Sequence, residues 1–262
     1  MEDFKDRLRR ETESLFKTIF PSKCEKFHKL VYDPMLGPDA MLAINITVNE
    51  SCKALREEIK QREEESKKIK DRFYTPAQSD SELDDSSERC RKLKRKLKQD
   101  RDDDEEKEDI DLSNMECNKH ISKIIDVLKP EVRELIESCN TVKTWVQLQI
   151  PEIQDGNNFG VEVQEEILEE VRKVEDDCNT FLKTISVYHL TRAEMVSKFI
   201  KFPSVDDYVC SLEQLDAKEF VTLRLIALEL RNYCLGLLDL FEKNMEKILT
   251  PRGINNVHML VY

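Results

Sequence analysis

Glycine is scarce in this chain, with five glycines and eight prolines among 262 residues. Sheet proteins need glycine at tight turns, and nucleotide-binding α/β folds need it in phosphate-binding loops. The shortage argues against both classes and favours long helices joined by few connections. Charged residues make up 37% of the chain, with abundant Leu, Glu, Lys and Ile, a composition typical of helical proteins. We therefore expect an all-α fold.

Long apolar runs are missing as well. No uninterrupted segment is long enough to span a bilayer, and the charged residues 1–7 offer nothing to a signal peptidase. The net charge of −12 argues against nucleic acid as the main partner, because phosphate contacts need a positive surface. We expect no membrane partner and no nucleic-acid partner.

Paired cysteines and catalytic motifs are also absent. The eight cysteines are spread almost evenly without a Cys-x-x-Cys pair, and we interpret them as reduced thiols of a nuclear or cytoplasmic protein. The four histidines lie far apart, and no phosphate-binding loop or nucleophile motif occurs. A helical metal or cofactor bundle would need pairs of inward Glu-x-x-His motifs. We expect no metal, no cofactor and no enzymatic activity.

Apolar residues at steps of three and four predict long helices. We expect a bend or short break at Phe20–Pro21, a kink at Pro130 and an N-cap at Ser204 that is followed by two aspartates. Helices of 30–45 residues, each about 45–65 Å long, pack best as an elongated four-helix bundle. The predicted helices cover residues 2–33, 121–146, 159–199 and 204–249.

Two further stretches carry structural information. Residues 39–55 are ambiguous, because Ile44, Ile46 and Val48 alternate as in a strand; without a second strand candidate, an extended connector is preferred over a sheet. The fourth helix has more apolar residues than one stripe holds, so one stripe suits the bundle core and another a neighbouring subunit. These residues are Leu223, Leu225, Ile226, Leu228, Leu230, Leu235, Leu237, Leu238 and Leu240.

Apolar residues nearly vanish from Arg56 to Ile110, where residues 89–98 are strongly basic and residues 100–109 strongly acidic. Such a segment cannot bury enough apolar surface to offset its ordering entropy. We expect residues 70–112 to form a disordered insert, with room for a frayed helix before it. The predicted regions are N-terminal helices at 1–60, a charged insert at 61–112, C-terminal helices at 113–251 and a tail at 252–262.

The second and third predicted helices are joined by residues 147–161. Pro151 stops one helix, and Gly156 with Asn157 and Asn158 can supply a positive-φ turn or cap the next helix. On these features alone, the segment is a helix-connecting loop.

The same residues carry a family resemblance. The seventeen-residue run from Trp145 to Val161 resembles the activation loop of the 11S proteasome activators, also called the REG family. The match continues through residues 185–198 and 223–232 to Pro251, Arg252 and Tyr262. It omits only the charged insert and is nearest to gamma-type members of the family.

The resemblance implies a homo-oligomeric ring of seven subunits that seats on the end-ring subunits of the proteasome core particle and opens its gate without ATP. Asn157 stands at the position most closely tied to gate opening. The implied activation loop consists of Glu152, Ile153, Gln154, Asp155, Gly156, Asn157, Asn158, Phe159 and Gly160. The implied docking tail ends in Met259, Leu260, Val261 and Tyr262, which can dock by main-chain pairing; the alternative is a frayed terminus.

Three positions depart from the family pattern. Glu152 stands where the family usually has a basic residue, and Gln154 stands where it often has an acid. These changes alter the loop charge and put the strength of the gate contact in question. Glu194 replaces a lysine of gamma-type members at a position that affects which core activities are stimulated. The sequence therefore leaves open whether the chain stimulates the same core activities as gamma-type members.

The basic cluster has two interpretations. It fits a nuclear import signal, and it fits half of a charge-balanced flexible loop paired with the acids that follow. Gamma-type relatives are nuclear, which favours import. Its residues are Arg91, Lys92, Lys94, Arg95, Lys96 and Lys98.

A different functional class also fits the composition. A helical coiled-coil scaffold or adaptor could recruit partners through the charged insert without any proteasome role. The C-terminus separates the two hypotheses, because only the activator needs its last residues.

Overall fold

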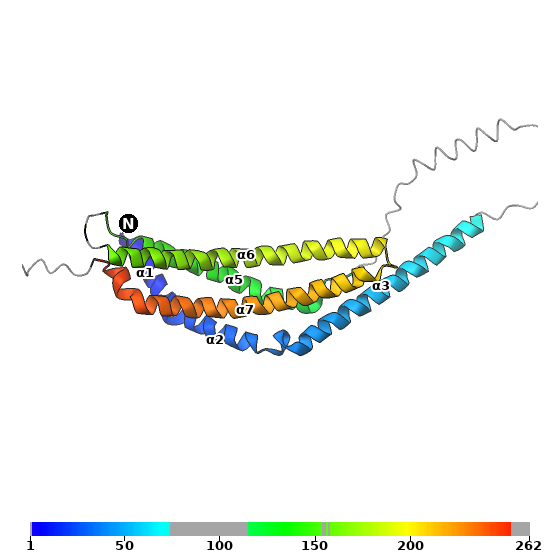
Figure 1. The fold of residues 1–262 in the computed structure, drawn as a ribbon, viewed down its shortest axis with the longest axis horizontal. Coiled ribbons are helices and arrows are strands. Elements are labelled where there is room, and N and C mark those ends of the chain that lie inside the picture. Colours follow the sequence, from blue (N-terminus) through cyan, green and yellow to red (C-terminus); the bar gives the residue numbers. More distant parts are fainter. Residues whose placement is uncertain (1, 74–114, 154–155, 157, 253–262) are drawn as a thin grey trace, which may run out of the picture. The chain divides into compact units, whose positions relative to one another are not determined.

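The computed structural model describes residues 2–73, 115–153, 156 and 158–252 (Figure 1). Its elements are α1 (Glu2–Ser14), the π-helical turn η1 (Leu15–Ile19), α2 (Phe20–Val31), the 3₁₀ turn η2 (Pro34–Leu36), α3 (Pro38–Phe73), α5 (Lys119–Gln147), α6 (Phe159–Lys201) and α7 (Asp206–Leu249). The described residues contain no strand, so the all-α prediction is confirmed.

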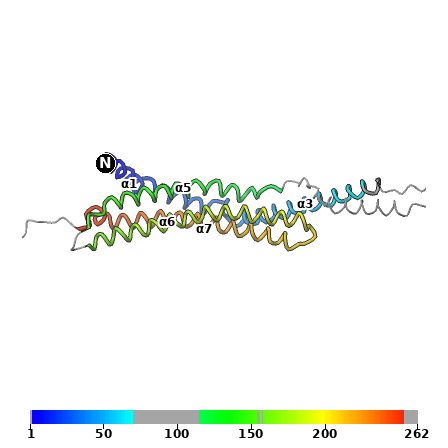
Figure 2. The backbone as a smooth tube through the Cα atoms, turned by 90° about the horizontal axis from the view of Figure 1, so that it is seen from above, coloured from blue at the N-terminus to red at the C-terminus, as the bar shows by residue number. Residues whose placement is uncertain are grey.

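The chain divides into two compact units. The first joins Met1–Glu50 to Cys117–Tyr262, and the second is Ser51–Glu116. Within the first unit, α6 packs against α5 and α7, and α2 packs against α7 (Figures 1 and 2). The N-terminal helices therefore complete a bundle with the three long C-terminal helices, as the periodicity predicts.

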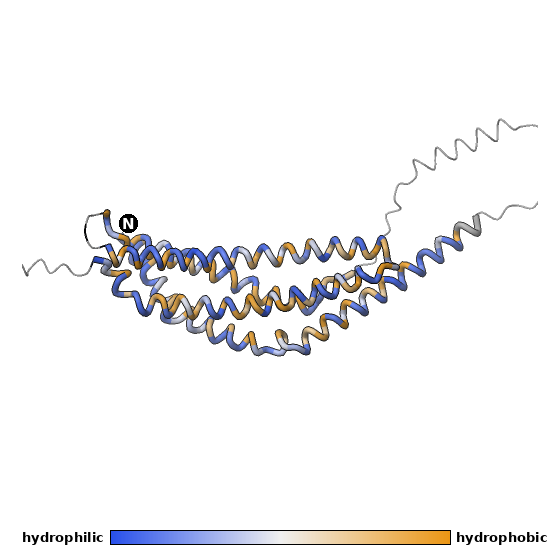
Figure 3. The backbone as a smooth tube through the Cα atoms, in the orientation of Figure 1, coloured by the Kyte–Doolittle hydropathy of each residue, from blue (hydrophilic) through white to orange (hydrophobic). Residues whose placement is uncertain are grey.

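The core of the first unit draws on all of these helices. Apolar and polar residues alternate along each helix at helical spacing (Figure 3), which directs one face inward. Each large side chain that is fully buried contributes about 1.5–3 kcal/mol through removal of apolar surface from water. Trp145 is buried among them. The largest fully buried side chains of this unit include Phe20, Phe27, Leu36, Ile121, Ile124, Leu128, Leu135, Ile167, Phe199, Phe220 and Phe241.

The predicted break near Phe20–Pro21 takes the form of a π-helical turn. The turn covers Leu15–Ile19, and α2 begins directly after it, with Pro21 in its first helical turn. The turn shifts the backbone pairing directly before the proline, since the Phe20 N–H donates to the Leu15 carbonyl oxygen five residues back. The irregularity therefore falls just before the proline rather than at it.

The prediction of an extended connector at residues 39–55 is wrong, because α3 covers this stretch from Pro38 onwards. Ile44 and Val48 are buried, whereas Ile46 is 48% exposed. The buried positions are therefore four residues apart, which is helical spacing. Tertiary packing of Ile44 into the core outweighs the strand preference of the β-branched residues. Residues 74–114, which hold most of the predicted insert, lie outside the described residues.

The predicted N-cap at Ser204 is also wrong. Val205 occupies the N-cap position of α7 and makes no side-chain capping hydrogen bond. Beside the helix start, the ring of Phe202 stacks on that of Tyr208 with centroids 6.5 Å apart. Asp206 and Asp207 do lie in the first turn, where their charges favour the helix dipole.

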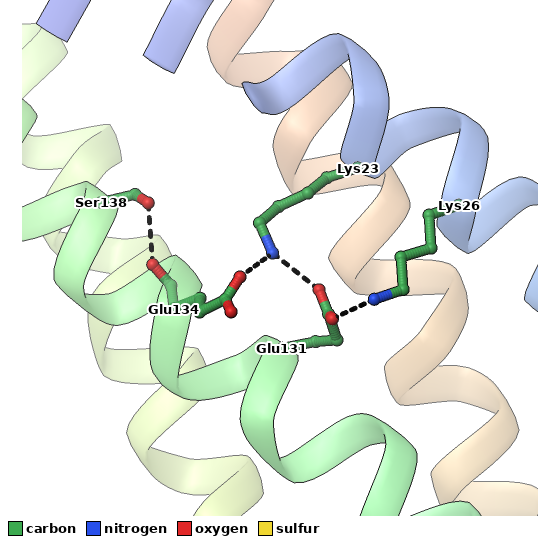
Figure 4. A network of polar contacts seen from close by, with 5 residues as sticks. All are labelled: Lys23, Lys26, Glu131, Glu134 and Ser138. Atoms are coloured by element: carbon green, nitrogen blue, oxygen red, sulfur yellow. Dashed lines mark hydrogen bonds and ion pairs between the residues drawn. The ribbon is translucent and has the colours of Figure 1, made fainter. Parts of the chain in front are cut away.

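A buried ion cluster fastens α2 to α5 beside Pro130, through which α5 continues (Figure 4). The Lys23 ammonium contacts the Glu131 carboxylate at 2.6 Å and also binds Glu134, while Lys26 binds Glu131. Burial alone would lower the pKa of Lys23, but the hydrogen bonds to Glu131 and Glu134 outweigh it and raise this pKa. The cluster is therefore charged and fixes the register of α2 against α5.

Candidate functional site

The loop between α5 and α6 displays apolar side chains to solvent. After α5 ends at Gln147, Leu148 and Gln149 complete its last turn by donating to Thr144 and Val146 carbonyls. Ile153 is fully exposed, and Phe159 at the start of α6 is 57% exposed. Exposed apolar side chains on a short loop are typical of a contact surface.

The predicted turn residues are borne out in part. Gly156 has a φ of 132°, a conformation that L side chains rarely adopt, so glycine is required at this point. Asn158 occupies the N-cap position of α6, but its side chain makes no capping hydrogen bond. Its backbone carbonyl accepts from Val161 and Glu162 instead. Gln154, Asp155 and Asn157 lie outside the described residues.

The end of α7 lies against the start of α6. A Cβ atom added to Gly160 would lie 2.0 Å from the carbonyl oxygen of Pro251 and 2.6 Å from its carbonyl carbon. These are backbone atoms, which cannot swing aside as a flexible side chain can. Only glycine fits at this position, because any other residue would push the two segments apart.

Gln164 is fully buried one turn further along α6. Its Nε2 atom donates to the carbonyl oxygen of Ile248 at 2.7 Å and to that of Gln149 at 3.2 Å. The last carbonyls of a helix have no intrahelical donor. One side-chain amide therefore caps the ends of α5 and α7 together.

Two surface contacts join the same segments. Arg252 Nη2 donates to the Glu152 carbonyl oxygen at 2.8 Å, and Lys247 Nζ lies 4.0 Å from the centroid of the Phe159 ring. We call the whole set of contacts the loop–tail joint. It consists of Gln149, Glu152, Phe159, Gly160, Gln164, Lys247, Ile248, Pro251 and Arg252.

Sequence reasoning did not find Gln164 or Lys247. A signal for Gln164 exists, since it is the polar member of an apolar stripe that continues through Ile167, Leu168 and Val171. A buried polar residue in such a stripe needs hydrogen-bond partners. Its partners lie on other elements and cannot be read from the periodicity of α6. Lys247 gives no signal, because lysine is ordinary in the last turn of a helix.

The remaining predicted sites are dispersed. Glu194 lies exposed on α6. The docking residues Met259, Leu260, Val261 and Tyr262 lie outside the described residues, as does the basic cluster at residues 91–98. The second apolar stripe of α7 is visible, because Leu225 and Leu235 are about half exposed while Leu223 and Leu237 are buried.

A second buried polar cluster lies near the α6–α7 connection. The Asp216 carboxylate is fully buried and accepts hydrogen bonds from Asn118 Nδ2 and the Tyr188 hydroxyl, each at 3.0 Å, and from Arg192 Nε at 3.2 Å. Burial raises the pKa of the nearby Glu219 to about 7; Lys218 opposes this shift and the Asp216 charge adds to it. Asp216 and its three partners join the start of α5 to α6 and α7.

The buried cysteines Cys178 and Cys234 are poorly suited to act as nucleophiles. Burial raises the pKa of the Cys178 and Cys234 thiols to about 12 each, which keeps them protonated at neutral pH. All seven cysteines in the described ranges are free thiols.

The described residues contain no group of three or more His, Cys, Asp or Glu suited to a metal ion. No helix among them combines the length and apolar character that a bilayer crossing needs.

Known proteins resemble the chain at both the sequence and the fold level. The family model for the C-terminal part of the proteasome activator PA28 matches residues 114–258, and that for its N-terminal part matches residues 1–49. Proteasome activator complex subunit 3, the gamma-type subunit, is 51% identical over 141 residues in human, mouse and chicken. This match covers 54% of this chain and 56% of each relative, so it spans about half of their length.

Solved structures show the same fold at lower identity. The 11S subunit of the Plasmodium falciparum proteasome, PA28, superposes with a TM-score of 0.65 at 23% identity, over 96% of this chain and 92% of that one. A mutated P26 activator in complex with archaeal 20S proteasome gives a TM-score of 0.51 at 13% identity, over 98% and 99%. Because the C-terminal family model alone covers more than half of the sequence, the chain belongs to the PA28 family of proteasome activators.

Proposed function

We propose that this chain is one subunit of a ring that activates the proteasome core particle without ATP. One observation carries the proposal: the base of the exposed loop and the base of the C-terminal tail are in contact at one end of the bundle. The tails bind the end-ring subunits, and the loops displace the turns that hold the gate closed. Peptide turnover then belongs to the core particle, and the chain itself catalyses no reaction.

The ring is proposed to contain seven copies of this chain. The exposed stripe that includes Leu225 and Leu235 supports subunit contact, since such side chains are otherwise left in water. Each tail alone binds weakly, whereas seven tails on one ring bind through their effective concentration. The ring therefore supplies affinity as well as shape.

Removal of the last two residues, Val261 and Tyr262, tests the proposal. Stimulation of fluorogenic peptide hydrolysis by purified core particle should disappear, while negative-stain images should still show rings. An intact chain that stays monomeric, or whose rings leave peptide turnover unchanged, contradicts the proposal and leaves the scaffold or adaptor as the better account.

Two finer proposals concern Glu194 and the compartment. Glu194 is proposed to affect which core activities the ring stimulates, because it is exposed on α6 and carries a charge opposite to that of the gamma-type lysine. Identical stimulation of basic, acidic and apolar peptides by wild type and Glu194→Lys contradicts this.

The chain is proposed to be nuclear, cytoplasmic or both. Substitution of Lys94, Arg95 and Lys96 by glutamine should lower its nuclear fraction if the basic cluster is an import signal.

A further inference from the structure

We propose that the loop–tail joint is a positioning element that delivers the activation loop to the gate when the tail docks. Gly160 and Gln164 are its central residues. This inference rests on the proposed function and adds a physical route from tail binding to loop placement.

The joint ties segments that the chain keeps far apart. Glu152 and Arg252 are one hundred positions apart in sequence, and their contact joins the first residues of the loop to the first residue of the tail. Gln164 bonds to carbonyl groups at the ends of both α5 and α7, so neither end can shift without losing a hydrogen bond. The loop base and the tail base therefore move together.

Such coupling is needed because docking through the tail places the loop only if the base of the tail is held against the base of the loop. The contact of Arg252 with Glu152 and the packing of Pro251 on Gly160 hold the two bases together. A fixed tail base converts docking into a defined loop position.

The contacts are poorly suited to a purely stabilising role. A neutral hydrogen bond contributes about 0.5–1.5 kcal/mol, and Gln164 supplies two at the edge of a bundle with an extensive apolar core. The same end of the molecule holds Ile153 fully exposed and Phe159 57% exposed, which leaves apolar surface in water. Precise placement of these side chains accounts for both features.

The two glycines of α6 and α7 give a matched test. Gly160→Ala and Gly236→Ala each replace a helical glycine with a better helix former. The new Cβ atom meets the Pro251 backbone at 2.0 Å in the first case and no atom within 4 Å in the second. Gln164→Leu is a second test variant, which removes the two donated hydrogen bonds while keeping a similar shape.

The assay measures stimulation of fluorogenic peptide hydrolysis by core particle as a function of activator concentration. The half-saturating concentration reports tail docking, and the maximum stimulation reports gate opening. For Gly160→Ala and Gln164→Leu we expect maximum stimulation to fall about tenfold, as a loss of about 1.4 kcal/mol would give, with half-saturation within about twofold of wild type. Gly236→Ala should match wild type in both quantities.

The possible results distinguish failure of this inference from failure of the proposed function. Full maximum stimulation by both test variants overturns the inference, whether half-saturation is unchanged or raised, because the joint then only holds the tail. Thermal unfolding and sedimentation velocity identify a variant that fails to fold or assemble, and the other variant then decides. A wild-type ring that does not stimulate the core particle at all contradicts the proposed function itself and removes the basis of this inference.

Discussion

The two ends of the first-unit bundle are built from different interactions. At the loop–tail joint, Gln164 donates neutral hydrogen bonds to backbone carbonyls, and two of the contacts lie at the surface. Near the α6–α7 connection, a fully buried Asp216 carboxylate gathers three donors. A buried charge holds its partners in one arrangement, because loss of a partner leaves the charge buried without compensation for its lost hydration. The single hydrogen bonds and surface contacts of the loop–tail joint cost less to break.

The largest expected effect comes from a substitution of the buried Asp216. Asp216→Ala leaves three buried donors without this acceptor, so we expect the free energy of unfolding to fall by about 3–5 kcal/mol. The matched control is Asp239→Ala, which removes a solvent-exposed partner of Lys243 and should cost less than about 1 kcal/mol. Urea denaturation of both variants measures the difference, and equal losses contradict the contrast between the ends.

The next effect depends on pH. Because the pKa of Glu219 is raised from 4.5 to about 7, the folded state binds more protons than the unfolded state between these values. The contribution of this group to stability is therefore highest below pH 4.5 and is lost as the pH rises through about 7. Above pH 7, Glu219→Gln should be more stable than wild type by about 1–3 kcal/mol.

The Glu219 measurement is a difference between unfolding free energies over a pH series. A carboxylate whose pKa is lowered on folding changes the free energy of unfolding with pH in the opposite direction. Glu131 is such a group, because hydrogen bonds from Lys23 and Lys26 outweigh burial and lower its pKa. The exposed substitution Glu242→Gln controls for loss of one charge. A constant difference between wild type and Glu219→Gln across the series contradicts the assignment.

The smallest effect lies at the loop–tail joint. Lys247→Met removes the contact between the ammonium and the Phe159 ring, a contact worth about 0.5–1 kcal/mol at exposed sites. We expect slightly faster hydrogen exchange at the first amides of α6 and no change around Asp216. Lys243→Met, one turn earlier on α7, should leave the exchange of α6 as it is. Equal exchange in both variants contradicts a holding role for Lys247.

The long helices were predictable because their signal is local. In α5 and α6, apolar residues recur at helical spacing over many turns, and each turn repeats the same information. Short signals failed. Three alternating residues at Ile44, Ile46 and Val48 suggested extended chain, and Ser204 suggested a cap where Val205 takes that position. At Ile44, packing with distant residues outweighed the local preference.

The sequence by itself determined the helical class, the positions of α5, α6 and α7 and, through the run from Trp145 to Val161, the family. Tertiary structure alone decided that Gly160 meets Pro251 and that Gln164 caps two other helices. The physical reason is the range of the forces involved. Helix formation depends on neighbours three and four residues away, whereas the joint forms only when packing of the core brings segments about a hundred residues apart into hydrogen-bond distance.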